Sequence, residues 1–169
     1  MMFNKKSFLY SLVACSLLIA CSDKDDLKIL DSDYFLFGEY YGQCYIDGEC
    51  CDGETCVEIF KIENTQLFED TNDNFPPTSA PYEGNYIILA DSTYQIVNNL
   101  LDEIPRKLFK ESKSIIGCPD CSDGGGIYIE VSRAGEVRYW LIDRIEENLP
   151  KYLIPFRQSV VSAIENINS

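Results

Sequence analysis

The sequence predicts one α+β domain, built from an antiparallel sheet of about five strands with two main helices packed on one face. Short segments in which apolar and polar residues alternate are separated by turn residues, as is typical of strands. Two longer segments carry apolar residues at helical spacing. Strands come first along the chain, followed by a helix, a hairpin and a last helix, which is the order of an α+β fold.

Three strands are expected before the first helix. Residues 34–41 are rich in aromatic side chains, and residues 56–63 alternate apolar with polar ones, with residues 66–69 as a short partner after a turn. The segment 44–55 between the first two strands is dense in Gly, Asp, Glu and Cys, so we expect a loop there. Asparagines and an adjacent pair of prolines predict a second loop at residues 70–81.

The first helix is expected to begin at Ser92, because Ser92 and Gln95 fit the capping box that opens helices. Pro105 should kink this helix or begin a second short one, since proline has no amide hydrogen to donate. The apolar stripe that follows helical spacing comprises Val97, Leu100, Leu101, Ile104 and Leu108.

A hairpin and a helix complete the predicted domain. Residues 127–131 and 137–142 alternate around the turn sequence at 133–136, which indicates a β-hairpin. Pro150 and Pro155 should make the last helix start late. Its apolar face is expected to comprise Leu149, Tyr152, Leu153, Phe156, Val160, Ile164 and Ile167.

Composition excludes several classes of function. The 169 residues include 28 acidic and 14 basic side chains, and this balance argues against nucleic-acid binding, which needs a basic face. The chain has no histidine, so it can form neither a Ser–His or Cys–His catalytic pair nor a His-ligated zinc site. We therefore name no catalytic residue and predict no cofactor.

The N-terminus predicts an export signal. Lys5 and Lys6 precede an apolar run at residues 8–20, which is too short for a membrane-spanning helix. The run ends in Leu18-Ile19-Ala20-Cys21, which looks like a bacterial lipobox, whose cysteine is acylated and becomes the first residue after cleavage. Cys15 fits the same pattern, but only Cys21 is followed by a charged, polar segment. We expect lipidation at Cys21.

This assignment divides the chain into a signal peptide at residues 1–20, a lipidated cysteine with an acidic tether at 21–33, and a single domain at 34–169. Several acyl chains on Cys21 would attach the protein to a membrane without spanning it. The acidic tether Ser22-Asp23-Lys24-Asp25-Asp26 is similar to the signal that sends Bacteroidota lipoproteins to the outer face of the outer membrane. A periplasmic location, with a merely solvated tether, is the alternative.

Six cysteines remain after lipidation, and an even number in an exported chain favours disulfides. Cys44 and Cys56 flank the predicted loop between two strands and are candidates for closing it. Cys50 and Cys51 are adjacent, so different partners are expected for each. Fifteen pairings are possible for six cysteines, and the sequence does not select one.

Cys118-Pro119-Asp120-Cys121 matches the C-x-x-C motif of thiol oxidoreductases. No helix is expected to begin at Cys118, and the neighbouring aspartates would raise its pKa, so a structural disulfide is favoured over a redox pair. A metal site is a third interpretation, in which Cys118 and Cys121 join two of the four loop thiols Cys44, Cys50, Cys51 and Cys56.

Three weaker patterns have simpler interpretations. Asp70-Thr71-Asn72-Asp73-Asn74 begins like a calcium loop, but Phe75 replaces the required glycine, so a polar turn is expected. The glycines at 124–126 precede a strand and are interpreted as a connector rather than a phosphate loop. The aromatic residues of 34–41 and Trp140 are expected to pack on the sheet rather than form an exposed binding surface.

Four segments together resemble small lipoproteins of flavobacteria and related Bacteroidota. They are Cys21 with its acidic tail, Phe37-Gly38-Glu39-Tyr40-Tyr41-Gly42-Gln43-Cys44, Cys56-Val57-Glu58-Ile59-Phe60-Lys61, and Cys118-Pro119-Asp120-Cys121-Ser122-Asp123-Gly124-Gly125. The resemblance covers most of the mature chain and implies a lipoprotein, but it implies no activity. Cys50 and Cys51 depart from the pattern, which leaves their partners open.

The sequence therefore predicts a non-catalytic binding or accessory module, held at the outer membrane through Cys21, for a protein or small-molecule partner that it does not identify. The alternative is an exported thiol–disulfide or metal-handling protein that uses Cys118 and Cys121. A third possibility, a carboxylate-based hydrolase, would require two acids paired at the base of a pocket.

Overall fold

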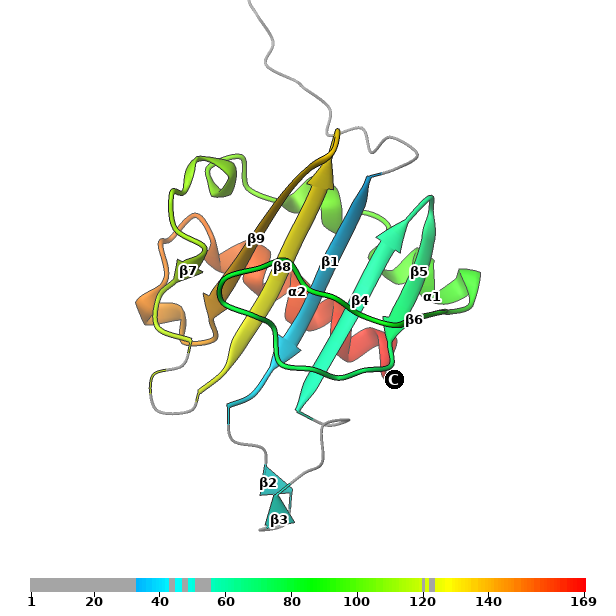
Figure 1. Ribbon diagram of the computed structural model, residues 1–169, viewed down its shortest axis with the longest axis horizontal. Helices are drawn as coiled ribbons and strands as arrows, with labels where there is room; N and C mark the ends of the chain where they lie inside the picture. The colour runs from blue at the N-terminus through cyan, green and yellow to red at the C-terminus, as the bar shows by residue number, and fades with distance from the viewer. Residues whose placement is uncertain (1–32, 43–44, 47–48, 51–55, 120, 122–123) are drawn as a thin grey trace, which may run out of the picture.

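The computed structural model describes residues 33–42, 45–46, 49–50, 56–119, 121 and 124–169. These residues form a sheet with helices on one face and a long irregular segment on the other (Figure 1). In spatial order, the main sheet consists of β6 (Tyr86–Ile88), β5 (Gln66–Asp70), β4 (Val57–Glu63), β1 (Tyr34–Tyr40), β8 (Gly126–Arg133), β9 (Glu136–Asp143) and β7 (Ile115–Ile116). The helices are α1 (Asp91–Val97) and α2 (Ile154–Ile167), with 3₁₀ turns at η2 (Leu100–Glu103), η3 (Leu108–Lys110) and η5 (Glu146–Asn148).

The α+β class, the two helices and the largely antiparallel sheet are confirmed, and the prediction of about five strands is roughly consistent with the sheet observed. The five predicted strands form the centre of a seven-stranded sheet in the described part of the chain. The two missed strands, β6 and β7, are edge strands of three and two residues, which is too short for an alternating pattern to show. β7 pairs in parallel with β9. The predicted loop at 44–55 also contains the small pair β2 (Tyr45–Ile46) and β3 (Glu49–Cys50).

The predicted start and length of the first helix are wrong. Ala90, not Ser92, occupies the N-cap position of α1, and no side chain caps it. The helix ends at Val97, where two asparagines of low helix propensity follow, and the chain continues in 3₁₀ turns. The predicted apolar stripe still faces the core, because a 3₁₀ turn places side chains three residues apart on the same side. Its buried members are Val97, Leu100, Ile104 and Leu108.

The predicted hairpin is confirmed as β8 and β9. Arg133 pairs with Glu136, and the two residues between them, Ala134 and Gly135, both have positive φ, 53° and 83°. Positive φ at both positions is the requirement of the turn whose twist matches paired strands. The last helix starts late as expected, with Pro155 in its first turn.

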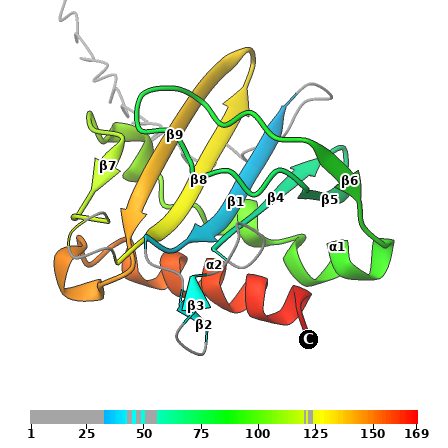
Figure 2. The same cartoon turned by 60° about the horizontal axis from the view of Figure 1, so that its bottom comes forward.

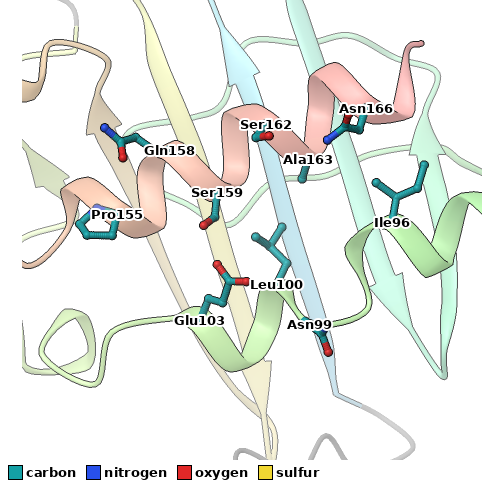
Figure 3. A pocket seen from close by; sticks show the side chains of 10 residues that line it. All are labelled: Ile96, Asn99, Leu100, Glu103, Pro155, Gln158, Ser159, Ser162, Ala163 and Asn166. Carbon is teal, nitrogen blue, oxygen red and sulfur yellow. The ribbon is translucent and has the colours of Figure 1, made fainter.

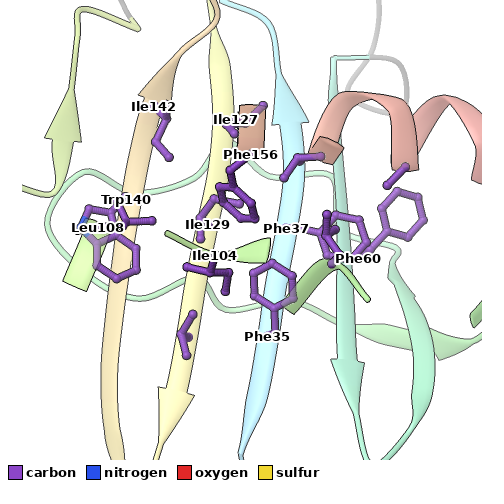
Figure 4. Packing of buried hydrophobic residues seen from close by; sticks show 14 of the residues in the cluster. Phe35, Phe37, Phe60, Ile104, Leu108, Ile127, Ile129, Trp140, Ile142 and Phe156 are labelled. Atoms are coloured by element: carbon purple, nitrogen blue, oxygen red, sulfur yellow. The ribbon is translucent and has the colours of Figure 1, made fainter. Parts of the chain in front are cut away.

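The helix-covered face of the sheet carries the main core. Phe35 and Phe37 from β1 stack at 5.4 Å between ring centroids, and Phe60 from β4 lies 5.6 Å from Phe37. Figure 4 shows these rings facing Phe156 of α2, beside Trp140 of β9. The aromatic residues therefore pack mostly on the sheet, as expected.

No helix in the described ranges combines the length and the apolar character needed to cross a bilayer.

The opposite face is covered by residues 71–85, which we call the strap. It crosses β1, β4 and β8 in front of the sheet in Figure 1, while α1 and α2 lie behind; Figure 2 shows the same separation from below. The predicted loop is thus confirmed as irregular, but it packs over one face of the sheet and does not extend into solvent. Beneath it lie the buried carboxylates of Asp70 and Glu130 and a second apolar cluster, in which Tyr82 of the strap packs with Tyr128 of β8.

Candidate functional site

A cavity of about 290 Å³ opens between α2 and one end of the sheet, where β1 and β9 finish and β4 and β8 begin. The residues that α2 contributes recur every three or four positions, so they share one face of the helix. The lining is Glu39, Tyr40, Tyr41, Glu58, Gly126, Ile127, Arg144, Arg157, Val161, Ile164, Glu165 and Asn168. We call this space the sheet-end cavity.

Two arginines line the part of the cavity near β8 and β9. The guanidinium of Arg144, which directly follows β9, lies 4.6 Å from the ring centroid of Tyr41 and donates to the carbonyl oxygen of Gly124 at 3.3 Å. Arg157, in the first part of α2, faces Glu146 across a loose ion pair of 3.6 Å. Its Nε is buried and has no hydrogen-bond partner in the structure. This end of the cavity is therefore cationic, with donor capacity left over.

Two carboxylates line the part of the cavity formed by β1 and β4. Glu39 and Glu58 are directly opposite each other on the paired strands. Like charges in that position disfavour the sheet. The Tyr41 hydroxyl donates to Glu39, and the side-chain amide of Asn168 donates to Glu58 at 2.8 Å. Both donors are neutral, so these contacts leave the paired negative charge in place.

Burial raises the pKa of two groups in the cavity lining, Glu58 and Tyr41. Burial raises the pKa of Glu58, the hydrogen bond from Asn168 opposes that change, and the charges of Glu69 and Glu39 add to it. Burial and the hydrogen bond to Glu39 raise the pKa of Tyr41 to about 12, so Tyr41 remains a neutral donor at neutral pH. Apolar side chains of Ile127, Val161 and Ile164 lie between the charged ends.

The Cys118–Cys121 pair lies near this end of the sheet and forms a disulfide, with 5.2 Å between its Cα atoms. The glycine connector leads from it into β8. Gly125 has φ of +71°, and a Cβ there would lie 2.0 Å from the carbonyl oxygen of Tyr40, so only glycine can pack so closely on the end of β1. The glycines thus act as a packed connector, as their position before a strand predicts.

Asp143 ties the disulfide segment to the end of β9. The Cys118 amide donates to its carboxylate at 2.7 Å, the Ile145 amide at 2.8 Å and the Asn148 side chain at 2.8 Å. Burial alone would raise the pKa of Asp143, but these hydrogen bonds outweigh it and lower the pKa. A carboxylate rather than a helix N-terminus therefore lies against Cys118, and it disfavours a thiolate there. Both cysteines are exposed, which a redox role would need.

Cys56 lies at the same end of the sheet. Its carbonyl oxygen accepts the amide of Tyr41 at 2.8 Å, and it is itself disulfide-bonded. The side chain of its partner is not among those described. Cys21, Cys44 and Cys51 lie outside the described residues, as do the lipobox, residues 21–32 of the tether and the side chain of Cys50. Cys56 and the Cys118–Cys121 disulfide thus both lie toward the end of the sheet where the cavity opens.

The metal interpretation concerns the reduced protein only, because sulfurs in a disulfide provide no thiolate ligand. Elsewhere in the described part of the chain, no group of three or more Asp, Glu or Cys side chains is arranged to hold a metal ion. Asp70, from the calcium-like segment, is buried and instead accepts the backbone amides of Asp73 and Asn85. That segment is a polar turn, as expected.

A larger hollow of about 570 Å³ lies on the outer side of the helix layer, between α2 and η2. Figure 3 shows amides and hydroxyls around it, including Asn99, Gln158 and Ser159, with Glu103 as its one acidic side chain among the labelled residues. It is open and nearly uncharged. The sheet-end cavity is the stronger candidate for a binding site, because both positively and negatively charged side chains line it.

No family model, no curated protein and no solved structure matches this chain. The site is therefore defined by geometry alone. Sequence reasoning missed Glu39, Glu58, Arg144 and Arg157, since they are far apart along the chain and belong to no motif. The sequence signal for Glu39 and Glu58 is that each is a charged residue inside a predicted strand, two positions from a phenylalanine on the same strand face, Phe37 or Phe60.

Proposed function

We propose that this protein is a lipid-anchored exported module that binds a small polar ligand in the sheet-end cavity, without catalysing a reaction. The observation that carries this proposal is that Arg144 and Arg157 line the same partly open cavity as Glu39 and Glu58. Buried or half-buried charges cost free energy unless they are paired. A site that keeps them, with donor capacity unused, suits a charged ligand.

The position of the tether supports display of the cavity. The tether joins the domain just before β1, and the cavity lies where β1 ends. At about 3.3 Å per residue, the seven residues of β1 separate the two points by roughly 23 Å. A protein held through Cys21 would therefore carry its cavity at the end of the sheet remote from the attachment point. The outer-membrane surface remains the proposed location, with the periplasmic face as the alternative.

The test of the anchor is the Cys21→Ala variant, expressed in a bacterium that processes lipoproteins. We expect the parent to partition with membranes and to yield an acylated N-terminal cysteine by mass spectrometry. The variant should lose both properties. Equal fractionation of the two proteins, with no lipid on either, would overturn the anchor.

The test of the site is a thermal-unfolding screen of the purified mature protein against amino acids, short peptides, sugars and nucleotides. A ligand at about 100 times its Kd stabilises the folded state by about 2.7 kcal/mol, a readily measured shift in Tm. We expect a hit that shifts the parent and the exposed control Arg133→Gln but not Arg157→Gln. A hit that shifts all three equally, or no hit at all, would contradict binding in this cavity.

A second candidate function is a carboxylate-based hydrolase, favoured by the Glu39–Glu58 pairing inside a cavity. Burial raises the pKa of Glu58, and a carboxyl group with a raised pKa beside a second acid is an arrangement that general acid–base catalysis uses. Glu58→Gln separates the two candidates. It should abolish turnover of a bound compound in a hydrolase, whereas in a binding module the parent itself leaves the compound unchanged.

The thiol–disulfide alternative at Cys118 and Cys121 is supported by the exposure of the pair and opposed by the carboxylate of Asp143. A redox role requires a thiol pKa well below the ordinary value in the reduced protein. Alkylation rates measured against pH would detect such a thiol. An ordinary or raised pKa would leave the disulfide as a structural crosslink.

A further inference from the structure

The sheet-end cavity separates its charges along one line. Along α2, the lining runs from Arg157 to the C-cap residue Asn168, which is about 16 Å at 1.5 Å per residue. The ion pair with Glu146 holds the Arg157 end beside β9, and the hydrogen bond from Asn168 to Glu58 holds the other end beside β4. Arg157 therefore lies at the end near β9 and Glu58 at the end near β4, while Arg144 and Glu39 both contact Tyr41.

The positive end has the chemistry of a carboxylate site. An arginine presents a planar fork of donors that matches the two oxygens of a carboxylate. Nε of Arg157 is buried without a partner, and buried donors in folded proteins are nearly always satisfied. The Arg157 side chain is 17% exposed, so a ligand carboxylate would meet the terminal nitrogens of its guanidinium rather than the buried Nε. Arg144, exposed and stacked on Tyr41, is placed to add a second guanidinium.

The negative end has the chemistry of an ammonium site. Glu39 and Glu58 face each other across paired strands, and their hydrogen bonds come from the neutral Tyr41 and Asn168. A cation placed between the two carboxylates would relieve the repulsion, and a primary ammonium also brings three donors. Glu165, exposed on α2, lies on the same lining.

The middle of the cavity limits what can join these ends. Ile127, Val161 and Ile164 make it apolar, and a volume of about 290 Å³ is at the lower limit for small-ligand pockets. Two or three residues of extended peptide span about 7 to 10 Å. This is shorter than the 16 Å of lining along the helix, because side chains that point into the cavity occupy part of that length.

We propose that the ligand is a free peptide of two or three residues, bound with its carboxylate at Arg144 and Arg157 and its amino group between Glu39 and Glu58. This inference rests on the proposed function and names its ligand class. A protein C-terminus would offer the carboxylate but no nearby amine, so a blocked N-terminus separates the two sources.

The test is calorimetric titration of the membrane-extracted protein, disulfides intact, with trialanine, N-acetyl-trialanine and trialanine amide. Loss of one charge-assisted contact weakens binding about tenfold or more. We expect that loss for each blocked peptide. We expect it also for Arg157→Gln and Glu58→Gln, but not for their matched controls Arg133→Gln and Glu103→Gln, with thermal unfolding verifying that every variant folds.

The outcomes distinguish the inference from the proposed function. If N-acetyl-trialanine binds as tightly as trialanine, the amine site is wrong and a C-terminal peptide is the ligand. If neither blocked nor free peptide binds, but another compound binds in a manner sensitive to Arg157→Gln, the peptide inference fails and the binding module stands. If nothing that binds is sensitive to Arg157→Gln or Glu58→Gln, both fail.

Discussion

The two faces of the sheet are covered by different means, and their side chains differ accordingly. Under the helices the buried side chains are apolar, with Phe37, Phe60 and Ile129 at 0% exposure. Under the strap, Glu130 is also at 0% exposure, and Asp70 is at 3%. A helix satisfies its own backbone amides, whereas an irregular segment brings unpaired N–H groups onto the sheet. The strap therefore needs acceptors beneath it.

Buried carboxylates supply those acceptors. Glu130 accepts the amide of Tyr82 at 2.8 Å, with the hydroxyls of Tyr34 and Tyr128 as further donors. Asp70 accepts the amide of Asn85 at 2.5 Å and the Tyr82 hydroxyl at 2.6 Å. The same device recurs outside the strap, where Asp33 accepts the amide of Ala134 and Asp143 that of Cys118. Part of the acidic surplus of this chain is thus structural.

The largest effect is expected on the helix-covered face. Phe37→Ala removes a fully buried ring from a stacked cluster and should lower the free energy of unfolding by about 4 kcal/mol, measured by denaturant titration. Phe75→Ala on the strap is the control, because Phe75 is 54% exposed and should cost about 0.5 kcal/mol or less. Similar costs for both would mean that the two faces do not differ as described.

A smaller loss is expected from removing the main acceptor under the strap. Glu130→Leu leaves the Tyr82 amide and two tyrosine hydroxyls without their carboxylate, which should cost about 2 to 3 kcal/mol. The exposed Glu136→Leu serves as a control in the same hairpin. An equally stable or more stable Glu130→Leu protein would show that apolar cover alone suffices on this face.

Asp70→Asn should loosen the strap locally rather than unfold the domain. The neutral amide offers one acceptor oxygen where the carboxylate offers two, so the amides of Asn85 and Asp73 should exchange with solvent about tenfold faster. Hydrogen exchange followed by NMR gives that readout. Unchanged exchange at both amides, with Asp91→Asn as the exposed reference, would remove Asp70 from this role.

The smallest effect concerns Asp143 and depends on pH. Its pKa is lowered in the folded state, so its contribution to stability is complete above the unfolded value of about 4 and is lost as pH falls through the folded value. Asp143→Asn should cost about 1 kcal/mol at pH 7 and less at low pH. Denaturation at pH 7, 5 and 3 tests this, and a cost that grows with acidity would reverse the assigned sign.

The comparison also explains which parts of the fold were predictable. Alternation in residues 127–131 and the turn at 133–136 are local signals, and the hairpin formed where they indicated. The same alternation marks Tyr128 and Glu130 as a polar face, yet that face is buried, because a segment some fifty residues earlier in the chain covers it. When a distant, irregular segment covers a sheet face, the hydrophobic pattern of the strands does not reveal that the face is buried.

The candidate site was less predictable than the fold. The cysteine motif indicated one disulfide, and Cys118 and Cys121 form it. The cavity beside it depends on α2 crossing the end of the sheet, which brings Arg157 near Arg144 and Asn168 to Glu58. No spacing along the chain encodes that crossing. Strand register, which opposes Glu39 to Glu58, is equally invisible without the paired strand.

The shortness of the Cys118–Cys121 loop bears on the order in which the molecule matures. Only two residues separate these cysteines, so they meet without any help from distant parts of the chain. If the chain is exported as proposed, this bond can close in an oxidising compartment before the roughly fifty residues that follow Cys121 have emerged. The glycine connector would then lead into β8 from a disulfide that has already formed, and the hairpin would fold next to it.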